Sequence, residues 1–233
     1  MLTHALAMCR YLLEHTVFYE LLAFTDVETF EVASDAFLSF RELFTRHGVL
    51  TQEFLGAHGD EFFRAFNSQL LKSTNYVTRR QSLKLLGELL LTPGHVSAMM
   101  KYISDAGHLM LIMTLLRDPS RSIQFEAFHL LKVMIANPSK PQPVLDVLKS
   151  NGDRLQRFLS DFQADRDEND PDFHAEKQTL GAHSEPLGKN LAHLPRTRLT
   201  RPACRVEPHS RHVEAVIAPP PAPGGITQPH APL

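Results

Sequence analysis

The sequence contains no tryptophan and only two cysteines, Cys9 and Cys204, among 233 residues. These cysteines lie far apart in segments of different composition, so we expect no disulfide framework and a reducing, cytoplasmic environment. No run of 18 or more apolar residues occurs, so we expect no membrane-spanning helix. The formal net charge is only −2, which gives no general attraction to nucleic acid or to an anionic membrane.

Several further patterns are missing. No segment shows sustained alternation of polar and apolar residues, so we predict no strands and an all-α fold. There is no glycine-rich phosphate loop and no nucleophile elbow. His209 and His212 have a spacing seen in metal sites but lack fitting partners nearby, and we predict no zinc site. These absences favour a protein that is not an enzyme and carries no cofactor.

What the sequence does have is a strong helical pattern over Tyr76–Leu91. One broad apolar stripe recurs at helical spacing, formed by Thr78, Leu83, Leu85, Leu86, Leu89 and Leu90. Ser73, Thr74 and Asn75 can cap its start, and Pro93-Gly94 stops it. The segment therefore predicts one long helix that buries a single face.

Two other stretches repeat this pattern. Residues 32–44 and 123–135 align with residues 78–90, which places Asp35, Gln81 and Glu126 in one column at offsets of 46 and 45 residues. Armadillo and HEAT repeats have periods of about 40–47 residues. We therefore predict a right-handed armadillo/HEAT-like solenoid, built from two short helices followed by a long one.

The remaining segments fill in this scheme. The expected short pairs are 4–15 with 17–24, 49–57 with 59–72, 95–104 with 107–117, and 142–150 with 152–164. The helical-repeat domain is expected to span 1–180. Residues 181–233 are rich in Pro, Gly and His and have few large apolar side chains, so we predict a disordered tail.

Four strings carry a resemblance to a known family: 30–50, 75–91, 99–104 and 115–133. They closely resemble the calcium-binding-protein-39-like family of armadillo-type scaffolds, over about residues 5–180. The resemblance implies a scaffold that binds and allosterically supports protein kinases or pseudokinases. Its implied partners are a STRAD-like pseudokinase, sterile-twenty-class kinases or NDR-type kinases. Family members carry a further N-terminal half of similar repeats and a charged final helix, neither of which we find here.

The resemblance also implies a peptide site. In the family, a hydrophobic pocket takes a C-terminal Trp-Glu-Phe motif, and its arginine and methionine fall on Arg80 and Met113. An arginine can pair with a carboxylate and stack on an aromatic ring, and a methionine adapts to an aromatic plug. Met110 stands where relatives often carry lysine, and Val96 stands where they carry an aromatic residue. Lys84, one turn from Arg80, can line the same groove.

Each of these residues also has a plainer interpretation. Arg80 and Lys84 can be ordinary solvated charges on a helix, and Met113 can be ordinary core. The acidic residues Asp165, Asp167, Asn169 and Glu176 have an EF-hand-like spacing, but Asp170 occupies the position that needs glycine. We therefore predict no calcium site and interpret this segment as an acidic loop.

Three functions remain open, of which two are binding functions and one is catalytic. The first is a kinase-supporting scaffold with a long concave surface, working as a monomer within a heteromeric complex. The second is a peptide-binding adaptor without kinase-activating ability, because the N-terminal half is absent. The third is an enzyme, which would need carboxylate, His or Lys clusters on successive long helices, where the aligned columns are mostly apolar.

We also expect marginal solubility, because the first repeat lacks a polar capping repeat before it. Light scattering during purification is expected to show self-association of the full chain. A monodisperse monomer with a cooperative thermal melt would contradict this expectation.

Overall fold

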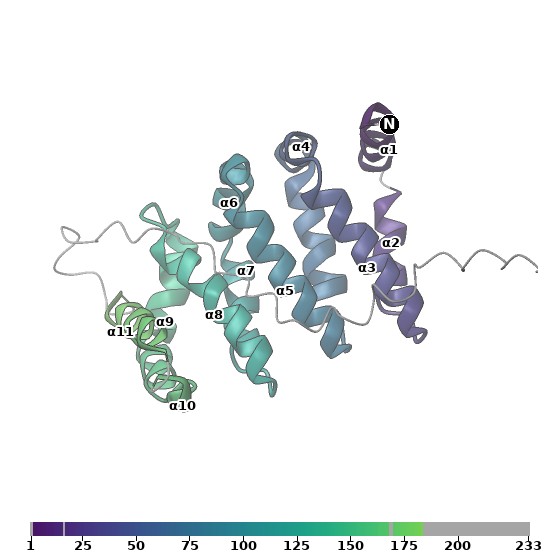
Figure 1. Cartoon of the computed structure of the whole chain (residues 1–233). Helices are drawn as coiled ribbons and strands as arrows, with labels where there is room; N and C mark the ends of the chain where they lie inside the picture. Colours follow the sequence, from purple (N-terminus) through teal and green to yellow (C-terminus); the bar gives the residue numbers. More distant parts are fainter. Residues whose placement is uncertain (1, 16, 168–169, 184–233) are drawn as a thin grey trace, which may run out of the picture. The chain divides into compact units, whose positions relative to one another are not determined.

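The computed structural model describes residues 2–15, 17–167 and 170–183, and these are helical almost throughout (Figure 1). Its side chains are described for 4–15, 17–164, 166 and 170–180. No strand occurs within these ranges, which confirms the all-α prediction. None of the described helices has the length and apolar character needed to cross a membrane. The predicted tail lies outside the described residues from 184 onward and stays a prediction.

Three long helices of 16 residues each form the repeating element. They are α3 (Phe30–Thr45), α5 (Tyr76–Leu91) and α8 (Arg121–Ala136). Helix α5 packs against both α3 and α8, so the three lie side by side (Figure 1). All six residues of the stripe predicted for α5 are buried. The long-helix periodicity seen in the sequence is therefore confirmed.

Shorter helices connect the long ones. Before α3 come α1 (Leu2–Glu14) and α2 (Phe18–Phe24), and before α8 come α6 (Val96–Ile103) and α7 (Ala106–Leu115). These four match the predicted short pairs. A 3₁₀ turn, η2 (Pro93–His95), follows α5, as expected from Pro93-Gly94. The described chain ends with α10 (Ala164–Asp167) and α11 (Pro171–His183).

Two of the predicted pairs of short helices were wrong, because in each case the structure has one continuous helix across the predicted break. Residues 48–66 form the single helix α4 (Gly48–Phe66), which passes into a π-helical turn, η1 (Asn67–Leu71). Likewise α9 (Gln142–Asp161) crosses the predicted break at 151–152. Gly59 and Gly152 are buried inside these helices, where packing outweighs the roughly 1 kcal/mol helix cost of glycine. The amide of Asn151 donates back to the Val147 carbonyl and so supports the helix instead of opening a turn.

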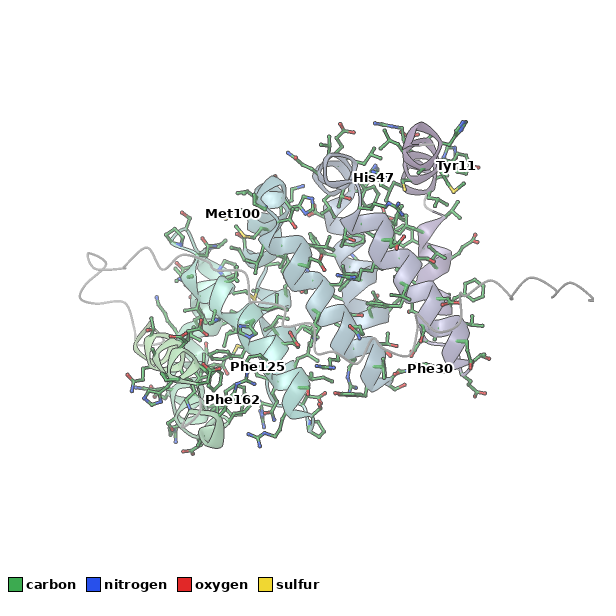
Figure 2. All side chains as sticks on the ribbon, in the orientation of Figure 1. Tyr11, Phe30, His47, Met100, Phe125 and Phe162 are labelled. Atoms are coloured by element: carbon green, nitrogen blue, oxygen red, sulfur yellow. The ribbon has the colours of Figure 1, made fainter. Side chains whose placement is uncertain are left out.

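Phenylalanine rings form the centre of the first repeat. Phe18 of α2, Phe44 of α3 and Phe62 of α4 are fully buried. The Phe44 and Phe62 ring centroids lie 4.7 Å apart, and the Phe18 ring meets Phe44 edge to face at 5.5 Å. A second aromatic group joins α8 to α11, where Phe128 lies 5.5 Å from Phe162 and 5.1 Å from Phe173 (Figure 2 labels Phe162). These contacts fix the orientation of the long helices at both places.

Buried hydroxyl groups tie α5 to the turn that precedes α3. The Thr78 hydroxyl donates to the Thr25 carbonyl at 3.0 Å, and the Ser73 hydroxyl donates to the Asp26 carboxylate at 2.8 Å. Each replaces a bond to water that burial removes. The start of α5 is therefore held against the preceding repeat.

Large apolar side chains are exposed on the first three helices. They include Leu6, Met8 and Tyr11 on α1, Phe24 on α2, and Phe30, Val32 and Leu38 on α3. The solubility expected from the sequence stays a prediction.

Asn75 caps α5, and its removal gives a direct test of this helix start. Its side-chain oxygen accepts hydrogen bonds from the Val77 and Thr78 amides at 2.9 and 3.4 Å. We expect Asn75→Ala to lower the free energy of unfolding by about 1 kcal/mol, measured by urea denaturation. Asn75→Asp, which keeps the capping oxygen, is the control. Equal stability of Asn75→Ala and the unmodified protein would show that the cap contributes nothing.

Candidate functional site

Two adjacent arginines on the first turns of α5 have very different surroundings. Arg79 is committed to structure. Its guanidinium pairs with the Asp118 carboxylate at 3.2 Å and donates to the Ser73 carbonyl at 3.1 Å. The Asp118 side chain is only 9% exposed, so this ion pair is largely shielded from water. Arg79 therefore fastens the loop before α8 to the start of α5.

Arg80 makes no such structural contacts among the described residues. It is half-buried, and within the described part of the chain its guanidinium has no hydrogen bond or ion pair. Its Nε atom is enclosed without a hydrogen-bond partner, as is the Nε atom of Arg79, but Arg80 lacks the contacts that the other guanidinium nitrogens of Arg79 make. A buried donor left without an acceptor costs about 1–3 kcal/mol. Arg80 thus has unused donor capacity, which an incoming acceptor group can satisfy.

A second cation lies one turn further along α5. Lys84 forms an ion pair with Glu126 of α8, with 3.6 Å between Nζ and Oε1. The Lys84 side chain is 45% exposed, whereas that of Glu126 is 18% exposed. Burial raises the pKa of Glu126, and the charges of Lys84, Arg80 and Arg166 oppose this rise. Lys84 therefore pairs directly with Glu126, and the charge of Arg80 also acts on that carboxylate.

Tyr76 borders the same cations. It is exposed on the first turn of α5, and a hydrogen bond with Ser122 of α8 lowers the pKa of its phenol. The charges of Arg80 and Lys84 act in the same direction. Tyr76, Arg80 and Lys84 together with Glu126 and Ser122 form what we call the α5–α8 polar cluster.

The Lys84–Glu126 pair has counterparts at the neighbouring helix contacts. Arg41 of α3 pairs with Glu88 of α5 at 3.0 Å, and Lys132 of α8 pairs with Glu176 of α11. In all three pairs the cation comes from the earlier helix. These pairs are partly exposed, so each contributes less than about 1 kcal/mol. They mark a common polar edge where successive long helices meet.

The three apolar candidates lie on the helices beside this cluster. Met113 of α7 is partly buried and packs against the core, whereas Met110 is 53% exposed on the same helix. Val96 begins α6 and is 54% exposed. Helix α6 contacts α5, and α7 contacts α8. The structure pairs Lys84 with Glu126. A single pocket shared by Arg80, Lys84, Met113, Met110 and Val96 stays a prediction.

Glu126 and Tyr76 were not identified as site residues from the sequence. A signal for Glu126 was present, because its repeat column contains only polar residues, Asp35, Gln81 and Glu126. Such a column predicts an exposed edge but not the partner of each side chain. No comparable signal marked Tyr76, whose relevance comes from its contact with Ser122.

The acidic segment before α11 shows no metal-binding arrangement in the part that is described. The side chains of Asp165, Asp167 and Asn169 lie outside the described residues. The carboxylate of Asp170 accepts a hydrogen bond from the Phe173 amide, and Glu176 pairs with Lys132. Elsewhere among the described side chains, no group of three or more His, Cys, Asp or Glu residues could hold a metal ion.

Successive 16-residue helices that pack against one another and are joined by further helices define an all-α helical-repeat protein of the armadillo/HEAT kind. The family can be named more closely. The model of the Mo25-like family matches residues 2–185, and the chain belongs to this family. This family is one of scaffold proteins.

Relatives from distant eukaryotes support this assignment. The chain is 51% identical over 173 residues to the degreening-related gene dee76 protein of Auxenochlorella protothecoides, covering 74% of this chain and 53% of that protein. It is 48% identical over 163 residues to the human calcium-binding protein 39-like, covering 70% and 48% of the two chains. The Mo25-like protein of Schizosaccharomyces pombe is 45% identical over 171 residues, with coverages of 73% and 51%. The chain thus spans about half the length of these curated relatives.

The contrast between the two arginines predicts opposite effects on stability. Arg79→Ala leaves the poorly exposed Asp118 carboxylate without its partner, and we expect a loss of about 1–3 kcal/mol in the free energy of unfolding. Arg80→Ala removes no hydrogen bond or ion pair and also removes the enclosed, unsatisfied Nε donor, so we expect it to lose less stability than Arg79→Ala. Paired urea titrations check both expectations. A larger loss for Arg80→Ala than for Arg79→Ala would contradict the assignment of the structural role to Arg79.

Proposed function

We propose that this chain is a non-catalytic scaffold that binds a protein kinase or pseudokinase and supports its active conformation. The observation that carries the proposal is Arg80, a half-buried guanidinium without a partner among the described residues, on a long helix of a Mo25-like repeat fold. A cation in this state favours a ligand that brings an anionic or carbonyl acceptor. The partners we propose are a STRAD-like pseudokinase, a sterile-twenty-class kinase or an NDR-type kinase, met in the cytoplasm.

The docking segment would be a C-terminal peptide with an acidic residue and aromatic anchors, such as Trp-Glu-Phe. Arg80 would bind its carboxylate through a planar fork of donors and lie against an aromatic ring. Met113 would adapt its flexible thioether to the second ring. Lys84 and the half-exposed Met110 and Val96 would border the peptide. Together these residues supply both the charge and the apolar contact that such a peptide needs.

Kinase support would follow from differential binding. A scaffold that binds the closed kinase conformation more tightly than the open one raises the population of the closed form. The shift is limited by the ratio of the two affinities. The exposed edge of the long helices is the surface we assign to this contact.

A narrower function is the alternative. The chain spans about half the length of its relatives, and kinase activation through a longer surface would need the remainder. In that case the chain would be a peptide-binding adaptor that docks a kinase without activating it. A kinase assay with and without the scaffold separates these two functions, because only the first predicts stimulation.

Peptide binding to the full chain tests the site itself. We expect a fluorescent peptide ending in Trp-Glu-Phe to bind at micromolar level in an anisotropy titration. Arg80→Ala and Met113→Ala should each weaken binding about tenfold or more, which corresponds to about 1.4 kcal/mol. Lys84→Ala should have a smaller effect, because this side chain already pairs with Glu126.

Arg64→Ala is the matched control, since Arg64 is an exposed arginine on α4, outside the α5–α8 polar cluster. Circular dichroism must show that each variant is folded. Failure of the folded, unmodified chain to bind would remove peptide docking from the function. Equal losses in Arg64→Ala and Arg80→Ala would show that only general electrostatic attraction is at work.

A further inference from the structure

Glu126 is the feature of the α5–α8 polar cluster that a peptide-binding function leaves unexplained. Its side chain is 18% exposed, forms an ion pair with Lys84 of α5 and lies in the field of Arg80 from the same helix. A carboxylate in that position opposes the binding of another carboxylate. An acidic side chain at a site proposed for an acidic peptide therefore calls for a physical explanation.

The geometry of the Lys84–Glu126 pair gives the first part of that account. Its 3.6 Å separation exceeds the 2.7–2.9 Å of a strong charge-assisted hydrogen bond. By comparison, Arg41 and Glu88 at the preceding helix contact approach to 3.0 Å. Glu126 thus interacts only weakly with Lys84. Little binding energy would be lost if the carboxylate of a ligand took its place beside Lys84.

The charges around Glu126 give the second part. Besides Lys84, the cations Arg80 of α5 and Arg166 of α10 act on it. Arg166 stacks on the Phe125 ring at 3.7 Å and pairs with Asp170 at 3.5 Å, so it is engaged elsewhere. His129, one turn along α8, has its pKa lowered to about 4 by burial and is neutral at physiological pH. The two α5 cations are therefore the ones whose attraction Glu126 and an acidic ligand would share.

We propose that Glu126 is a built-in competitor for the acidic group of the docking peptide and sets the affinity and selectivity of the Arg80–Lys84 site. This inference rests on the proposed peptide-binding function. In the free chain Glu126 partly neutralises the two cations, so that weakly acidic or non-cognate anions gain little from them. A peptide binds only when its carboxylate and aromatic anchors together outweigh the resident carboxylate.

The test is Glu126→Gln, which keeps the side-chain shape and removes its charge. Two peptides are used with the full chain: one ending in Trp-Glu-Phe with a free carboxylate, and one ending in Trp-Gln-Phe amide. Glu126→Gln should strengthen binding of the acidic peptide about three- to tenfold, as expected for one charge removed from a partly shielded site. Binding of the neutral peptide should change less than about twofold.

Two further variants locate the effect. Glu176→Gln removes the equivalent carboxylate from the next helix contact, where Glu176 pairs with Lys132. It should leave the affinity unchanged within about twofold, because that pair is screened from the site by solvent and ions. In the double variant Lys84→Ala with Glu126→Gln, most of the gain should disappear, since Lys84 is the cation with which Glu126 forms its ion pair.

The outcomes separate the inference from the function on which it rests. If Arg80→Ala weakens the acidic peptide but Glu126→Gln binds it no better than the unmodified chain, the competitor role is overturned and docking stands. An equal gain in Glu176→Gln overturns it as well, because the effect would then be general charge. Binding by neither protein overturns both ideas.

Discussion

The structure depends on the lateral packing of the long helices, with α5 held between α3 and α8. Seven of the sixteen residues of α5 are buried, which leaves its remaining faces free to carry polar side chains. Burial of apolar surface at about 25 cal/mol per Å² provides most of the stabilisation. The hydroxyl contact from Thr78 to the Thr25 carbonyl adds direction to this otherwise unspecific attraction. The polar cluster at α8 can form only because this packing fixes the distance between the two helices.

Much of this architecture could be predicted from the sequence, because the long helices combine three signals that agree. Tyr76–Leu91 has an apolar stripe, a capping Asn75 and a terminating Pro93, and each proved to act as expected. The breaks predicted within α4 and α9 were wrong for the opposite reason. There a single local signal, a glycine or an Asn-Gly pair, competed with apolar residues on both sides that share one buried face. Tertiary packing determines that both helices are continuous. Its contribution cannot be judged from a short stretch of sequence.

The candidate site was predictable only in part. Arg80 was identified through family resemblance and Lys84 through its place one turn further along the helix, and the structure adds that Lys84 pairs with Glu126. Arg79 and Arg80 cannot be distinguished by residue type, yet they point about 100° apart around the helix. These two adjacent residues therefore have different roles. Arg79 makes a structural contact, and Arg80 is available to a ligand. The difference arises because Asp118 lies beside Arg79. No pattern in the sequence predicts that Asp118 approaches α5.

The ion pairs at the helix contacts also give the array a direction. Helix α5 presents Glu88 toward α3 and Lys84 toward α8, and α8 presents Glu126 toward α5 and Lys132 toward α11. Each of these two helices thus offers a carboxylate to the helix before it and a lysine to the helix after it. A neighbour docked in reverse order would bring like charges together, at a cost of a few tenths of a kcal/mol per contact. Such a penalty is small for one pair but accumulates along an array, so charge placement helps similar helices assemble in the order in which the chain encodes them.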